Sequence, residues 1–218
     1  IYNFKELGEI LQTRHGIKLK SKCDTEVLIE LWRIYKKDAL SMLKGIYAFI
    51  IYDYEEEIIF ATRDQYGIKP LWIKETEDSF TFCSELNAFL KVDNINKLEN
   101  LDSIGLASYL LLGYVPHTVS IIKGYEQLRP GYLYIIDGKS TVSEPVYTKE
   151  IETPNINYIK KDINLSTKAD VSIGCLLSGG IDSTAIASLA STEKKIICYT
   201  IDYISNNKSY SLEDVECS

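Results

Sequence analysis

Three features that mark common protein classes are scarce in this sequence: histidine, long apolar runs and clustered positive charge. Its 218 residues include two histidines, His15 and His117, and neither has a catalytic partner nearby, so a histidine-based triad is not expected. Apolar runs such as Leu110–Leu112 are much shorter than the roughly 20 residues that span a membrane. The formal net charge is −7 and the basic residues form only short pairs, which argues against a nucleic-acid surface. We therefore expect a protein of small-molecule chemistry that binds neither membranes nor nucleic acids.

The five cysteines do not follow the pattern of a disulfide framework or a zinc site. Their number is odd and no two have CxxC spacing. Cys83, Cys175 and Cys198 stand among apolar residues, which predicts core thiols. Free thiols are typical of a reducing compartment, so we expect a cytoplasmic protein.

Helices and antiparallel strands are predicted for the first two thirds of the chain. Apolar residues at helical spacing predict helices over 3–15, 24–35, 84–90 and 102–112, with Asp24 as the N-cap of the second. Residues 46–54 and 58–62 are rich in β-branched and aromatic side chains and predict a hairpin. Residues 71–74 and 80–83 are predicted as two more strands of one antiparallel sheet, and 131–137 as a further strand. The fold class of this part is α+β.

The pattern changes near residue 150. Residues 149–169 are polar without a strong period, which predicts a linker. A strand over 171–177, a glycine loop, a helix over 182–191 and a strand over 196–202 then make a βαβ unit. Such a unit implies a parallel sheet, so we expect the start of an α/β domain.

The segment Leu176–Ser183 carries the clearest chemistry. An apolar strand leads into Gly179 and Gly180 and then a helix, whose first N–H groups and hydroxyls such as Ser178 favour an anion. It lacks the lysine of the common phosphate loop and the GxGxxG dinucleotide pattern. An ordinary strand-to-helix turn is the alternative. The five specified residues of the pattern Ser-Gly-Gly-x-Asp-Ser, placed between a strand and a helix, favour phosphate binding. Asp182 has two open roles, as the N-cap of the helix or as a partner of Mg²⁺ on the phosphates.

The pattern Ser-Gly-Gly-x-Asp-Ser resembles the pyrophosphate loop of the ATP pyrophosphatase superfamily, whose members cleave ATP to AMP and pyrophosphate. The resemblance implies that the loop holds the pyrophosphate half of ATP, that the end of the strand lines the nucleotide pocket, and that the next strand contacts adenine through its backbone. The residues implied are Leu176, Leu177, Ser178, Gly179, Gly180, Asp182 and Ser183, with Ile201 at the adenine.

The rest of the chain resembles one family of that superfamily, the glutamine-hydrolysing asparagine synthetases. Each match is short, but they occur in the family's order along essentially the whole chain. The matching segments are Ile1-Tyr2-Asn3, Cys23-Asp24-Thr25-Glu26, Gly45–Phe49 with Tyr52-Asp53, Arg63–Trp72, Ser84–Ala88, Gly113–Pro116, Leu128–Gly131 and Asp170-Val171-x-x-Gly174.

This resemblance implies two domains. Residues 1–148 are expected to be an incomplete α+β sandwich of Ntn-hydrolase type, with four layers, in which Asp24 faces the α-ammonium of glutamine. Residues 149–218 are expected to begin an α/β parallel-sheet domain of the adenine nucleotide hydrolase type. The family uses ATP with Mg²⁺, glutamine and aspartate, forms β-aspartyl-AMP, and releases AMP and pyrophosphate; a homodimer is a candidate assembly. We interpret Arg63 and Asp64 as a structural ion pair at a turn.

The sequence departs from the family at its ends. It begins at Ile1 rather than at the nucleophilic cysteine, whose own amine is the base in this family, and it stops within a helical pattern that starts at Ser211. We expect an internal piece of a longer polypeptide that has no catalytic residue of its own and is inactive alone. Two alternatives stay open: a sibling synthetase of the β-lactam or peptide-cyclase type, and an inactive truncated nucleotide-binding module.

Overall fold

The computed structural model describes residues 1–93, 95, 98–117, 119–138, 140–147, 155–169, 171–192, 195–201, 203–205 and 208–210. The chain divides into two compact units, one of Ile1 and Asn3–Lys149 and one of Tyr2 and Glu150–Ser218. The predicted helix from Ser211 and the motif residue Asp170 lie outside the described residues. None of the described helices has the length and apolar character needed to cross a membrane.

The first unit begins with two helices that bury one face each. α1 (Phe4–His15) ends at Gly16, whose φ of 67° is the left-handed conformation that glycine adopts without strain. α2 (Asp24–Tyr35) continues into the 3-10 helix η1 (Lys36–Met42). Leu11 and Leu31 are fully buried between these elements. The predicted helical spacing is confirmed here.

Two antiparallel sheets follow. The first has the order β1 (Ala48–Asp53), β2 (Ile58–Arg63), β6 (Tyr132–Ile136) and β7 (Thr141–Pro145). The second has the order β4 (Phe80–Cys83), β3 (Trp72–Glu75) and β5 (Glu126–Gln127). The expectation of one sheet is therefore wrong, because β2 pairs with the distant β6 and leaves β3 to pair with β4 and β5.

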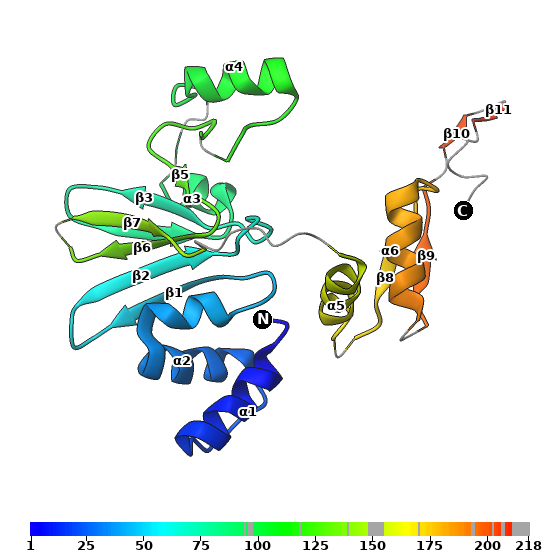
Figure 1. The fold of residues 1–218 in the computed structure, drawn as a ribbon. Coiled ribbons are helices and arrows are strands. Elements are labelled where there is room, and N and C mark those ends of the chain that lie inside the picture. The colour runs from blue at the N-terminus through cyan, green and yellow to red at the C-terminus, as the bar shows by residue number, and fades with distance from the viewer. Residues whose placement is uncertain are drawn as a thin grey trace. The chain divides into compact units, whose positions relative to one another are not determined.

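The side chains of these sheets define four layers. In β2, Phe60 joins the cluster beneath α1 and α2, whereas its neighbour Ala61 joins a second cluster with Ile73 of β3. On the other side of β3, Trp72 joins a third cluster around Phe89 of α3 (Leu86–Val92). This alternation has the period of two that a strand imposes. The first unit is therefore a helix–sheet–sheet–helix sandwich, with α1 and α2 on one outer face (Figure 1).

The second unit contains the predicted parallel pair. β8 (Gly174–Leu176) and β9 (Ile197–Tyr199) pair in parallel, and α6 (Ile181–Ser191) joins them in sequence. β10 (Tyr203–Ser205) and β11 (Lys208–Tyr210) form a short antiparallel pair. The predicted linker is wrong in part, because α5 (Ile156–Ser166) occupies it, with the side chain of Asn155 accepting from the N–H groups of Asn157 and Tyr158. The βαβ expectation is confirmed.

Helix α4 (Ser103–Leu112) approaches the backbone of another segment so closely that one position excludes a side chain. Asp102 caps the helix by accepting from the N–H groups of Ile104 and Gly105. A Cβ atom at Gly105 would lie 2.0 Å from the carbonyl oxygen of Ser120. The contact fixes α4 against the 120–121 segment.

We expect Gly105→Ala to lower the free energy of unfolding by about 1–3 kcal/mol, because the overpacking outweighs the roughly 1 kcal/mol by which alanine favours a helix. Urea unfolding followed by far-UV circular dichroism measures the change. Ser108→Ala in the same helix is the control, with an expected change within about 0.5 kcal/mol. Equal stability of the Gly105 variant and the natural chain would contradict the close approach.

Candidate functional site

A cavity of about 470 Å³ opens beside the N-terminus of α2 in the first unit. Its lining residues combine apolar side chains with one carboxylate, two ammonium groups, of which one is the α-amino group of Ile1, and three hydroxyl groups. The lining residues are Ile1, Asp24, Thr25, Leu28, Ile46, Tyr47, Ala48, Phe49, Lys69, Pro70 and Ser84. A pocket of this size with few polar groups among apolar walls is typical of a small-molecule site.

Asp24, the residue expected to bind glutamine, lies in this cavity. It is the first residue of α2 and does not cap it, because Cys23 has the extended backbone of the N-cap. The N-cap interpretation of Asp24 is therefore wrong. Oδ2 of Asp24 lies 3.0 Å from the α-amino nitrogen of Ile1, and the Cys23 thiol donates to Oδ1 at 3.7 Å.

The charge state of Asp24 suits a cation. Burial raises the pKa of its carboxyl group, but the hydrogen bonds from the Ile1 amino group and the Cys23 thiol, together with the amino group's charge, lower it more. The net pKa lies below its ordinary value, so the side chain is a carboxylate at neutral pH. In this chain the carboxylate is paired with the α-ammonium group of Ile1, so this side of the cavity holds an acidic group bound to an α-ammonium group.

Lys69 brings a positively charged side chain to the same cavity. It ends a turn in which the buried carboxylate of Asp64 accepts from the N–H groups of Tyr66 (3.2 Å), Ile68 (3.0 Å) and Lys69 (2.9 Å). Among the described residues, no carboxylate lies within ion-pair distance of its ammonium group. Lys69 belongs to the matching segment Arg63–Trp72, but no binding role was expected for it, and the turn carries it to the cavity.

The interpretation of Arg63 and Asp64 is confirmed for the turn and wrong for the ion pair. Arg63 Nη1 donates to the carbonyl oxygen of Leu128 at 3.2 Å, and its Nη2 donates to that of Gly67. Asp64 accepts from backbone N–H groups instead of from Arg63. Both side chains are buried and serve the backbone.

Tyr47 forms part of the cavity wall and stays uncharged. Its hydroxyl lies 2.7 Å from that of Tyr147, near the end of the first unit. Burial, with the hydrogen bond to Tyr147, raises the pKa of Tyr47 far above its ordinary value. Tyr47 therefore adds a neutral hydroxyl group to the cavity wall.

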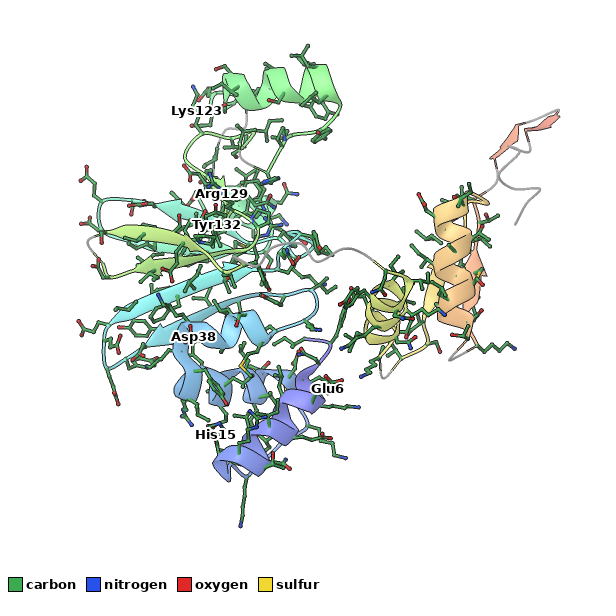
Figure 2. The ribbon with its side chains drawn as sticks, in the orientation of Figure 1. Glu6, His15, Asp38, Lys123, Arg129 and Tyr132 are labelled. Atoms are coloured by element: carbon green, nitrogen blue, oxygen red, sulfur yellow. The ribbon has the colours of Figure 1, made fainter. Side chains whose placement is uncertain are left out.

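The histidines take no part in this cavity. Nε2 of His15 lies 2.7 Å from the hydroxyl of Tyr35. His15 is the last residue of α1, and Figure 2 labels it at the end of that helix away from Glu6. The guanidinium carbon of Arg129 lies 4.8 Å from the ring centre of Tyr132, a cation–π contact. Figure 2 labels both residues in the first unit. These contacts are structural.

The second unit places the predicted phosphate loop between β8 and α6. Gly179 has a φ of 83°, which glycine permits, and Gly180 is the N-cap of α6. The Ser183 hydroxyl accepts from the N–H of Ser178 at 3.3 Å and donates to the carbonyl of Gly180 at 3.1 Å. The two serine oxygens lie 3.1 Å apart. The loop is therefore folded on itself by its own hydroxyls.

Asp182 does not cap the helix, so the N-cap alternative is wrong. It is exposed, and α6 has no side-chain cap hydrogen bond among the described residues. The N–H groups of its first turn are thus available to an anion. Across the described ranges, no three His, Cys, Asp or Glu side chains gather as metal ligands. A cation at Asp182 would need further ligands from a bound phosphate.

The strand ends bring the other predicted nucleotide residues to the same edge. Leu176 ends β8 with an exposed side chain, and the N–H of Leu177 donates to the carbonyl of Tyr199 at 2.8 Å. The Thr200 hydroxyl donates to the carbonyl of Leu177, and Ile201 follows it with 70% of its surface exposed. Leu176, Leu177 and Ile201 therefore lie together beside the loop.

Comparison with known proteins gives two family matches. Residues 1–148 match the glutamine amidotransferase domain, and residues 159–215 match asparagine synthase. Asparagine synthetase [glutamine-hydrolyzing] 1 of Bacillus subtilis is 30% identical over 87% of this chain and 31% of its own length. Asparagine synthetase [glutamine-hydrolyzing] 3 of the same organism is 31% identical over 96% of this chain and 36% of its own.

The chain spans about a third of the length of these curated relatives. Among solved structures, the glutamine phosphoribosylpyrophosphate amidotransferase of B. subtilis covers 95% of this chain and 45% of its own, with 19% identity and a TM-score of 0.46. The amidotransferase match over 1–148 agrees with the four-layer α+β class expected for that part.

We expect Asp64→Asn to lower the free energy of unfolding by about 1–3 kcal/mol, because an amide nitrogen replaces one acceptor of a buried turn. Thermal and urea unfolding measure the loss. Asp78→Asn, at an exposed position in the β3–β4 connection, is the matched control with an expected change within about 0.5 kcal/mol. If both variants unfold alike, the turn does not depend on Asp64.

Proposed function

The chain belongs to the glutamine amidotransferase family through residues 1–148, and on this premise we propose that its natural full-length protein is a glutamine-hydrolysing asparagine synthetase. Residues 1–148 are the glutaminase domain and residues 149–218 begin the ATP-binding synthetase domain. The overall reaction uses glutamine, aspartate and ATP, passes through β-aspartyl-AMP, and releases AMP and pyrophosphate. The names of the relatives favour this ligase over the sibling cyclases.

The observation that carries the proposal is the pair of opposite charges in the cavity of the first unit. An α-amino acid has an ammonium and a carboxylate group on one carbon atom, and Asp24 and Lys69 supply one complementary charge each. The hydroxyl groups of Thr25 and Ser84 add hydrogen-bonding capacity beside them. Glutamine is the amino acid that the family membership selects.

ATP is the second substrate, and the loop of the second unit suits its phosphates. Uncapped N–H groups at the start of α6 and the hydroxyls of Ser178 and Ser183 would hold the pyrophosphate half. Gly179 and Gly180 permit close approach of the backbone, since neither has a side chain in the way. Leu176 and Leu177 would line the pocket, and Ile201 would meet adenine through its backbone.

Asp182 would hold Mg²⁺, which neutralises phosphate charge when bound. Mg²⁺ in nucleotide sites takes one or two carboxylates, the phosphates and water, so a single exposed carboxylate near the loop fits this chemistry. The carboxylate makes no capping hydrogen bond, since Gly180 is the N-cap, and its position in the first turn of α6 also suits the helix dipole.

We place the protein in the cytoplasm and propose a homodimer as its assembly. The free thiols of Cys23, Cys83, Cys175 and Cys198 support a reducing compartment. Fractionation of cells and light scattering of the purified protein test these two statements.

We expect Asp24→Asn to raise the KM for glutamine about 10- to 100-fold with little change in kcat, because a charge-assisted hydrogen bond contributes about 1.5–3 kcal/mol. Lys69→Met should act in the same direction. Steady-state glutaminase kinetics of the natural full-length protein measure both.

The control for these variants is Glu30→Gln on the same helix. Glu30 pairs with Arg33 at 2.8 Å and does not line the cavity. The Glu30 variant should therefore have the KM for glutamine of the natural protein. An Asp24 variant with the natural KM would remove Asp24 from the glutamine site.

We expect Asp182→Asn to lower kcat/KM for Mg·ATP at least about tenfold, which is about 1.4 kcal/mol. ATP–pyrophosphate exchange by the natural full-length protein measures it. Asp162→Asn, an exposed carboxylate on α5, is the control and should leave the exchange unchanged. An unchanged exchange rate in the Asp182 variant would leave phosphate binding to the backbone and the serines.

A further inference from the structure

Two cysteines lie side by side on the parallel strands that carry the nucleotide loop. Cys175 of β8 is the register partner of Cys198 of β9, and both are free thiols. Register partners on neighbouring strands point to the same face of a sheet. Gly174 and Leu176 pair with Ile197 and Tyr199 on the opposite face, so the two thiols share theirs.

The spacing of the strands suits a covalent bond between these thiols. Neighbouring strands lie about 4.8 Å apart, which falls within the range of about 4.4–6.8 Å between the Cα atoms of a disulfide. Within this chain Cys198 is exposed and Cys175 is half-buried, with the Cys175 thiol donating to the carbonyl of Leu176 at 3.6 Å. The prediction that they are core thiols is therefore wrong for Cys198.

We propose that Cys175 and Cys198 are a redox modification site that forms an intrachain disulfide when the protein meets a hydroperoxide. The thiolate of one cysteine attacks the peroxide oxygen, which breaks the O–O bond and gives a sulfenic acid and an alcohol or water. The second thiol attacks that sulfur and displaces water. Two thiols are oxidised, one peroxide is reduced, and a thiol reductant reverses the bond.

The disulfide displaces the nucleotide loop. The effect of this displacement on ATP binding rests on the proposed function. A disulfide needs its Cβ atoms about 3.8 Å apart, closer than the strand spacing, so the two strand ends must move together. Leu176 and Leu177 join Cys175 directly to the loop serines, and the Leu177 N–H is bonded to Tyr199 of β9. Oxidation therefore displaces the amides that bind phosphate and weakens Mg·ATP binding.

The experiment treats the reduced natural full-length protein with hydrogen peroxide. Mass spectrometry of an unreduced digest identifies the linked peptides, and calorimetry with Mg·ATP measures affinity before oxidation, after it, and after dithiothreitol. We expect a bond between Cys175 and Cys198, a Kd for Mg·ATP at least about tenfold weaker, and recovery on reduction. Cys175→Ser and Cys198→Ser, or the alanine variants, should prevent both changes. Cys83→Ser, in the first unit, should prevent neither.

The outcomes separate the proposals. Absence of the linked peptides, or linkage of either cysteine to a different one, overturns the modification site. A disulfide with an unchanged Kd overturns its effect on the loop. If the reduced protein does not bind Mg·ATP, the proposed nucleotide function fails, while the digest still decides the disulfide.

Discussion

A buried carboxylate fixes the point where the chain leaves one sheet of the first unit for the other. Asp64 is 1% exposed and accepts from three backbone N–H groups in the five residues that follow it. Beside it, Arg63 bonds to the carbonyl groups of Gly67 and Leu128, and the N–H of Gly131 donates back to the carbonyls of Arg63 and Asp64. Because buried polar groups without partners are costly, these bonds fix β2, the turn and the entry to β6 together.

The cavity depends on that turn. The turn delivers Lys69 and Pro70 to one wall, while the start of α2 delivers Asp24 and Thr25 to another. The two charges come from segments about 45 residues apart, so neither segment forms the site alone.

In the second unit the groups available to a ligand are mainly backbone N–H groups, whereas in the cavity of the first unit they are side chains. Its loop offers N–H groups, two glycines and two hydroxyls, and Asp182 is the charged side chain that the loop itself contributes. The parallel pairing of β8 and β9 sets the position of the loop, and it also sets Cys175 beside Cys198. The chemistry of the loop and the chemistry of the thiols therefore depend on the same register.

The sequence by itself determined the local elements of this protein. Apolar spacing identified α1, α2 and α4, the alternation of strands identified the β1–β2 hairpin, and Ser178–Ser183 identified the loop, because these patterns come from neighbouring residues. The tertiary structure alone decided that β3 and β4 belong to a second sheet, that Lys69 shares a cavity with Asp24, and that Cys198 faces Cys175. Strand pairing, register and burial depend on residues far apart in the chain. Local periodicity does not specify which distant segment a strand will pair with.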